Sequence, residues 1–246
     1  MRHFHKNTQA PAVLRQNAVA ETQKLINAVA GGNNSPTIDP LYKHAEVKAQ
    51  LKSDQNGKCA YCERFFNGDY GAVEHFRPKG EWQQQKGMAK YKPGYYWLAY
   101  EWENLLYSCS ECNTIFKHSL FPLANPAVRD IAHRDIRREE PLLINPSSEN
   151  PADFIGFRRE LVVPRNVNGQ PSHKGQTTID LLGLNSRADL KKRRFDAYRE
   201  YKILLKIKSI LETVRMTMGV TLIDRFIDRH TNECAEFTGM FQNQIP

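Results

Sequence analysis

The sequence predicts an α+β protein in which a cysteine-rich centre of short strands lies between two helical regions. Residues 58–123 hold four of the five cysteines and all three tryptophans, and prolines and glycines interrupt this segment repeatedly. The flanking segments instead repeat apolar residues at helical spacing. The 246 residues are 40% hydrophobic and 25% charged, which is globular composition and excludes wholesale disorder and fibrous repeats.

Residues 1–57 are expected to form an N-terminal helical region. Apolar residues among good helix formers predict a helix over 12–30, which Gly31 and Gly32 end. A second helix is expected over about 41–53, before the turn dipeptide Asn56-Gly57.

The centre, residues 58–123, is expected to contain short strands, because its apolar runs are brief and bounded by turn residues. A long irregular loop is predicted over about 79–93, where Pro and Gly recur. One helix is expected to start near Cys109.

Residues 124–246 are expected to form a loop-rich linker followed by a basic helical region. A strand is predicted over 157–163, and Asn168-Gly169 marks a turn.

The basic region is expected to open with a capping box, Ser186-x-x-Asp189, in which side chains satisfy free backbone N–H groups. Apolar residues at helical spacing continue to Met218, and Gly219 is expected to end this helix. The apolar stripe is predicted to pack in the core. A shorter helix is expected over about 222–231.

The charge is unevenly distributed. The net charge is +8, and residues 187–230 contain twelve Lys and Arg against six Asp and Glu, a net of +6. This segment is either a solvated helix face or a contact for a polyanion such as nucleic acid. The longest run without charged residues, 25–38, is too short to span a bilayer, and the N-terminus lacks an apolar signal segment. A cytoplasmic protein with no membrane contact is therefore expected.

Two CxxC units, Cys59 to Cys62 and Cys109 to Cys112, are separated by 46 residues. Each unit lets two thiolates reach one ion, and two units complete the tetrahedral four-thiolate site that Zn²⁺ favours. Disulfides are the first alternative, but they are rare in cytosolic proteins. A redox CxxC is the second, but redox motifs rarely occur in pairs. The pattern favours structural zinc, and Cys234 is left without a role.

Between and beside these units, chemically capable residues follow one another in a fixed order: Glu74-His75, Asn104, then Asn113 directly after the last cysteine. A histidine can act as a general base near neutral pH. Carboxylate and amide oxygens can together hold a hard divalent ion such as Mg²⁺. Taken singly, each residue could equally be a hydrogen-bonded structural group or a cap.

In this order the segment Cys59 to Pro122 resembles the HNH endonucleases, whose core is a ββα-metal unit. The resemblance implies that Glu74 and Asn113 are ligands of a catalytic Mg²⁺ or Mn²⁺ ion, and that His75 is the general base. It also implies that Asn104 fixes the connecting loop. The chain departs from the commoner pattern in having Asn113 rather than His and Glu74 rather than Asp.

Two cations are predicted to contact substrate phosphates. Lys117 lies one helical turn after Asn113, on the same face. Arg77 lies two residues after His75, on the same side if the strand continues. For Lys117, an ordinary surface lysine is the alternative.

The resemblance extends to one subgroup, the HNH nuclease subunits (PtuB) of the Septu anti-phage defence system. It is carried by the matching segments Val73–Lys79, Tyr96–Leu98, Trp102–Leu105, Leu142–Pro146 and Leu182–Asn185. It implies an ABC/SMC-like ATPase subunit (PtuA) as partner and degradation of nucleic acid when phage attack is sensed.

The leading hypothesis is thus a metal-dependent endonuclease, with DNA favoured over RNA as its substrate. A non-catalytic zinc module that binds nucleic acid or protein is one alternative. A solitary restriction-type HNH nuclease without an ATPase partner is another.

Overall fold

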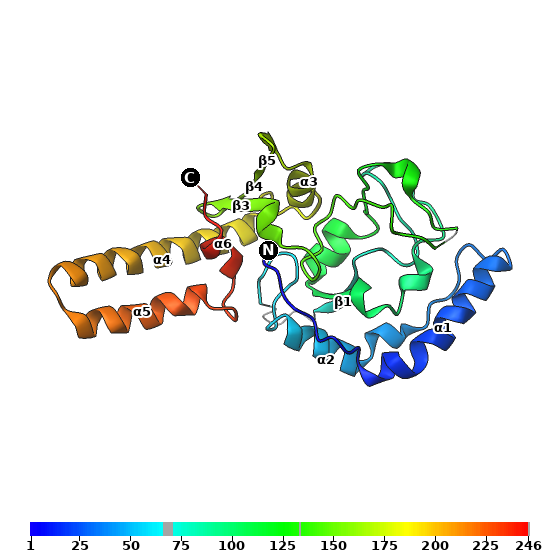
Figure 1. Cartoon of the computed structure of the whole chain (residues 1–246), viewed down its shortest axis with the longest axis horizontal. Helices are drawn as coiled ribbons and strands as arrows, with labels where there is room; N and C mark the ends of the chain where they lie inside the picture. Colours follow the sequence, from blue (N-terminus) through cyan, green and yellow to red (C-terminus); the bar gives the residue numbers. More distant parts are fainter. Residues whose placement is uncertain (66–70, 133, 246) are drawn as a thin grey trace.

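The computed structural model describes residues 1–65, 71–132 and 134–245. Helices, small two-stranded sheets and long loops form one body, from which a hairpin of two long helices, α4 and α5, projects (Figure 1). Buried side chains from the N-terminal, central and C-terminal segments pack in one hydrophobic core. None of the helices in these described ranges is both long and apolar enough to cross a membrane.

The N-terminal region forms α1 (Ala12–Ala30), η1 (Pro40–Lys43) and α2 (Ala45–Asp54). The predicted bounds of α1 are confirmed. The second predicted helix is divided in two, because Asp39 caps the short 3₁₀ turn of η1 and His44 then caps α2. The division places η1 beside the central strands.

In the centre, β1 (Ala72–His75) pairs antiparallel with β2 (Leu105–Ser108), so that His75 lies opposite Leu105. The short 3₁₀ turns η2 (Tyr96–Leu98) and η3 (Trp102–Asn104) precede β2. The helix expected near Cys109 is η4 (Glu111–Lys117), a π-helix in which the Asn113 carbonyl accepts the His118 N–H. Strand, strand and helix therefore follow one another around the two CxxC units.

The linker carries two further 3₁₀ turns, η5 (Pro126–Val128) and η6 (Pro151–Asp153). The single strand predicted over 157–163 is wrong. The chain forms a hairpin of β3 (Ile155–Arg158) and β4 (Leu161–Pro164), because Arg159 takes a φ of 58° and reverses the direction. The turn dipeptide Asn168-Gly169 joins β5 (Asn166–Val167) to β6 (Gln170–Pro171).

The C-terminal region contains α3 (His173–Leu181), α4 (Ala188–Thr213), α5 (Thr217–Thr231) and α6 (Thr238–Gln242). The predicted capping box does not form: Arg187 is the N-cap residue and makes no side-chain cap, while the Ser186 hydroxyl bonds to the Gly183 carbonyl. The predicted end at Gly219 is also wrong. The chain turns at Arg215, whose φ is 54°, and Gly219 lies inside α5.

Gly219 has a packing role instead of a terminating one. A Cβ at this position would lie 3.1 Å from Leu211 Cδ1 of α4, so glycine lets the two helices approach closely. The apolar stripe predicted to lie in the core is confirmed only at its start, where Tyr198 and Tyr201 are half-buried and pack against the core. At its far end the prediction is wrong, since Val214 is 61% exposed and Met218 is 87% exposed. The pair α4–α5 instead carries apolar side chains to solvent.

Candidate metal centres and catalytic cleft

The four cysteines of the two CxxC units gather in one buried cluster. Their Sγ atoms all lie within 4.8 Å of one another, and those of Cys62 and Cys109 are 3.8 Å apart. A tetrahedral site with Zn–S bonds of about 2.3 Å separates its sulfurs by about 3.8 Å. The cluster could therefore hold a metal ion such as zinc.

Local donors complete the environment that four thiolates require. The backbone N–H of Cys109 donates to Cys59 Sγ at 3.4 Å, and the Arg187 guanidinium donates to Cys112 Sγ at 3.2 Å. Burial tends to lower the pKa of Arg187, but the thiolates of Cys112 and Cys62 outweigh it and raise the pKa. A buried cation against the cluster compensates the excess negative charge of four thiolates around one divalent ion.

A cleft of about 440 Å³ lies beside the strand pair. Side chains of η1, β1, the loop after β1 and η4 surround it. It brings together three residues that the sequence predicts to act jointly: Glu74, His75 and Asn113. Within the described residues, the Asn113 side-chain amide has no hydrogen-bond partner, so its oxygen is available to a ligand.

His75 is buried and held in one orientation. Its Nε2 lies 2.9 Å from the Ala99 carbonyl oxygen, which can only accept, so the proton resides on Nε2. The Tyr42 ring packs edge-on, with centroids 4.6 Å apart. Burial lowers the pKa of His75 well below its usual value, so the ring is neutral at pH 7. Nδ1 keeps a lone pair and, within the described residues, has no protein partner.

Glu74 and Lys117 form a buried ion pair. Lys117 Nζ lies 2.6 Å from Glu74 Oε1 and donates to the His75 carbonyl at 2.8 Å. Burial raises the pKa of Glu74, and the charge of Lys117 opposes this shift. The predicted phosphate contact of Lys117 does not fit this geometry, because its side chain is fully buried. In the π-helix it turns inward to β1, while Asn113 lines the cleft.

Asn104 bonds to both sides of the connecting loop. Its side-chain oxygen accepts the Arg77 N–H at 2.7 Å. Its amide nitrogen donates to the carbonyls of Arg77 and Leu98, both at 3.0 Å. Three hydrogen bonds from one buried side chain hold the segment after His75 against η2. The Ala99 carbonyl that bonds to His75 follows η2 directly.

Arg77 makes contacts inside the protein that stabilise the fold. Its Nε donates to Glu139 at 3.1 Å, and its guanidinium lies 5.4 Å from the centroid of the Phe121 ring. The predicted phosphate clamp assumed a continuing strand, but β1 ends at His75. Arg77 therefore does not line the cleft.

Other cations line the cleft in its place. Lys79 Nζ lies 4.6 Å from the centroid of the Tyr42 ring, and Lys43 is exposed at the same cleft. Burial lowers the pKa of Lys79, Glu74 opposes this, and the charge of Lys43 lowers it further. Lys79 stands in the segment that resembles the HNH proteins. Tyr42 and Lys43 lie 37 and 36 residues before Lys79, outside that segment, and no local motif marks them.

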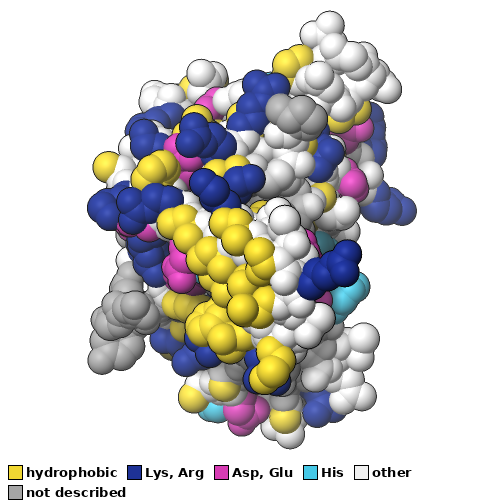
Figure 2. Space-filling view, turned by 90° about the vertical axis from the view of Figure 1, so that its left-hand side faces the viewer, with side chains coloured by type: hydrophobic (Ala, Val, Ile, Leu, Met, Phe, Trp, Pro, Cys, Tyr) yellow, Lys and Arg dark blue, Asp and Glu magenta, His cyan; other side chains and the backbone are white. Residues whose placement is uncertain are grey.

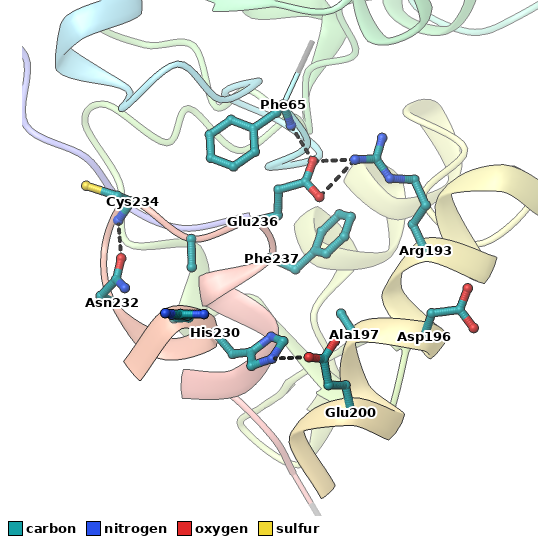
Figure 3. Close-up of a pocket in the computed structure, with 12 residues that line it drawn as sticks. Phe65, Arg193, Asp196, Ala197, Glu200, His230, Asn232, Cys234, Glu236 and Phe237 are labelled. Carbon is teal, nitrogen blue, oxygen red and sulfur yellow. Dashed lines mark hydrogen bonds and ion pairs between the residues drawn. The ribbon is translucent and has the colours of Figure 1, made fainter. Parts of the chain in front are cut away.

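A second pocket of about 570 Å³ lies at the base of the hairpin (Figure 3). Its charges are mostly paired: Arg193 with Glu236 at 2.6 Å, and His230 with Glu200 at 3.6 Å. The sulfur of Cys234 points away from His230 (Figure 3). This pocket offers no nucleophile–base pair, so the cleft at β1 is the candidate catalytic site.

Comparison with known proteins gives relatives from one system, although no family model matches the chain. A Septu protein PtuB of Bacillus mycoides strain KBAB4 is 38% identical over 147 residues, which is 59% of this chain and 49% of that protein. A Septu protein PtuB of Bacillus thuringiensis is 28% identical over 56% of this chain and 41% of that protein.

A third relative is a Septu protein PtuA of the same Bacillus mycoides strain. It is 30% identical over 163 residues, which is 65% of this chain and 22% of that protein. The chain thus spans about half the length, or less, of each of these relatives. This chain is similar in sequence to proteins of the Septu system, PtuB and PtuA. It combines that similarity with a four-cysteine cluster and a cleft lined by Glu74 and His75.

Proposed function

We propose that this chain is a metal-dependent HNH endonuclease that hydrolyses phosphodiester bonds of nucleic acid, with β1, β2 and η4 as its ββα-metal core. One observation carries the proposal. A neutral His75, fixed through Nε2 to the Ala99 carbonyl, lines the same cleft as Glu74 and Asn113. A buried histidine with a free Nδ1 lone pair beside oxygen ligands suits the activation of water.

In this mechanism His75 Nδ1 takes the proton of the water that attacks the scissile phosphorus. The Ala99 carbonyl keeps the other proton on Nε2, and Tyr42 holds the ring plane. Asn104 keeps the backbone after His75 in register with η2. Lys79 and Lys43 bind the substrate phosphates electrostatically.

The catalytic ion would be held by oxygens of Glu74 and Asn113, with Mg²⁺ or Mn²⁺ as the fitting metals. Both donors line the cleft, and the Asn113 amide has no other side-chain partner within the described residues. When bound, the ion supplies positive charge that stabilises the charge developing on the phosphate and the leaving oxygen. Lys117 positions the Glu74 carboxylate for this role.

The biological setting we propose is anti-phage defence, with the chain as nuclease effector and an ABC/SMC-like ATPase subunit (PtuA) as partner. The resemblance to the HNH subunit of Septu and the similarity to proteins named PtuB and PtuA support it. A solitary restriction-type nuclease predicts that no ATPase co-purifies. A non-catalytic zinc module predicts no cleavage at all, but it does not explain why Glu74, His75 and Asn113 line one cleft.

The direct test is cleavage of supercoiled plasmid DNA, and of RNA, by the purified chain. Nicking is expected with Mg²⁺ or Mn²⁺ and is expected to be absent without added divalent ions, because the cleft holds oxygen donors for such an ion. The reaction is repeated with the ATPase subunit co-expressed. Cleavage at the same rate without divalent ions would contradict the proposed mechanism.

Lys79→Ala is expected to weaken nucleic-acid binding roughly tenfold, because one phosphate contact is lost. The slope of log Kd against log salt concentration is expected to fall by about one. Fluorescence anisotropy with labelled DNA over a salt series measures both. Lys86→Ala is the control, since Lys86 is an exposed cation that does not line the cleft. Equal effects of the two substitutions would show that Lys79 makes no specific contact with the substrate phosphates.

A further inference from the structure

The hairpin carries an apolar face that nothing in the described chain covers. On α4 and α5, apolar residues recur every three to four positions and are between 37% and 87% exposed. We call the following seven residues the apolar face: Ile203, Ile207, Ile210, Val214, Met218, Leu222 and Phe226. In Figure 2, which looks toward the projecting end, hydrophobic side chains gather in one patch with Lys and Arg beside it.

Two structural facts show that this face is one continuous surface. Spacings of three and four residues place the members of each helix on one side of it. Both rows border the seam between the helices, where Leu211 of α4 lies against Gly219 of α5. Of the fifteen residues of α5, none is buried. Soluble proteins rarely leave contiguous apolar surface of this kind open unless something binds it.

Cations line both outer edges of the apolar face. Lys202 and Lys206 each precede an isoleucine of the face by one residue, which puts them about 100° around α4. On α5, Arg225 stands at the outer edge, and Arg229 lies 4.7 Å from the Phe226 ring centroid. Lys202, Lys206 and Arg225 make no ion pair with any residue that the structure describes.

Most acidic residues of the hairpin are paired with other residues of the chain; Asp228 of α5 is exposed and, within the described residues, makes no ion pair. Asp224 pairs with Lys208 at 2.7 Å, and Glu200 lies 3.6 Å from the His230 ring. Asp189 pairs with Arg64 at 3.3 Å. The pairs Lys192–Asp196 and Lys208–Glu212 form along α4 itself. The four border cations Lys202, Lys206, Arg225 and Arg229 outnumber Asp228, so the border of the apolar face keeps a net positive charge.

We propose that the apolar face binds one amphipathic helix of a partner protein that carries Asp or Glu along both edges of its own apolar stripe. Such a helix would complete a three-helix bundle with α4 and α5 and neutralise both basic edges. The β-branched isoleucines have few rotamers, which suits packing against a helix. This inference does not depend on nuclease activity.

The charge of the two edges favours an acidic partner helix over a second copy of this chain as the occupant. Two copies meeting through this face would bring basic edges against basic edges, which is unfavourable. An anionic lipid surface would also attract the edges. However, the face is built from Ile, Val, Met, Leu and a single Phe, without the Trp that interfacial helices use.

The test uses two synthetic helical peptides of three heptads, with Leu at both core positions. One carries Glu and the other Lys at the positions flanking the core. Titration of the full chain by fluorescence anisotropy is expected to show binding of the Glu peptide only, weakening as salt rises. Absence of binding by the Glu peptide, or equal binding of both peptides, would overturn the proposal.

Adjacent residues of α5 provide a matched pair of variants. Leu222→Asp puts a charge into the apolar face and is expected to lower affinity for the Glu peptide at least tenfold. Thr221→Asn puts the uncharged isostere of Asp about 100° away, on the outer edge, where it leaves the basic charges unopposed, and is expected to change the affinity less than twofold. Leu222 is 54% exposed, so its replacement removes no core side chain. Circular dichroism confirms that both variants keep their helix content.

Two further measurements decide between occupants. Sedimentation velocity of the wild-type chain is expected to show a monomer, and a dimer that Leu222→Asp dissociates would assign the face to a second copy. Co-sedimentation with vesicles of phosphatidylglycerol and phosphatidylcholine is expected to show no binding sensitive to Leu222→Asp. Such binding would assign the face to lipid and overturn the proposal.

Discussion

His75→Ala is expected to lower the metal-dependent cleavage rate by about 10²–10⁴-fold, the usual contribution of a general base. The structure gives the reason. His75 lines the cleft, and the hydrogen bond from its Nε2 to the Ala99 carbonyl leaves the lone pair on Nδ1. Without it the attacking water has no base at that position. Initial rates of plasmid nicking at saturating Mg²⁺ measure the effect.

Because His75 is buried, its removal could also disturb the fold, so a second variant is needed. In His75→Gln, the side-chain amide retains an N–H donor for the Ala99 carbonyl but offers no base. His118→Ala is the positive control, since His118 is an exposed imidazole lining the same cleft and is expected to keep near-normal activity. Unchanged nicking by both His75 variants would eliminate the proposed active site.

Cys59→Ser is expected to abolish stoichiometric metal binding and to unfold the centre of the protein. Binding of structural zinc contributes about 10–16 kcal/mol in small zinc domains, which exceeds the whole stability of most domains. Here β1 and β2 are four residues each, too short to persist alone. Mass spectrometry of bound metal and thermal unfolding followed by circular dichroism measure the loss.

Cys234→Ser is the matched control, because Cys234 is exposed and lies outside the cluster. It is expected to retain one zinc per chain and an unchanged melting temperature. A wild-type chain that carries no metal yet melts at the same temperature as Cys59→Ser would refute a structural zinc site.

Local patterns predicted well where a single residue type decides the outcome. The bounds of α1 follow from its apolar spacing and from Gly31-Gly32. The doubled CxxC spacing predicted that four sulfurs would meet. The order Glu74, His75 and Asn113 predicted three side chains that the fold does bring to one cleft.

Outcomes that depend on tertiary contacts could not be predicted in this way. Whether Gly219 ends a helix or admits Leu211 depends on a neighbouring helix. Lys117 turns inward because η4 packs on β1 as a π-helix, and spacing does not reveal that geometry. Lys43 reaches the cleft only because η1 folds against the strands.

One short helix, η4, connects the four-cysteine cluster to the candidate catalytic cleft. η4 contains a cysteine of the cluster, Cys112, then Asn113 of the cleft, and finally Lys117, which holds Glu74. Seven residues thus connect the thiolates to the proposed catalytic ligands, so loss of the proposed zinc ion is expected to disturb the alignment of both. Under the nuclease function proposed above, a newly made chain is therefore expected to stay inactive until the four cysteines bind zinc, so that metal binding would control when DNA can be cut.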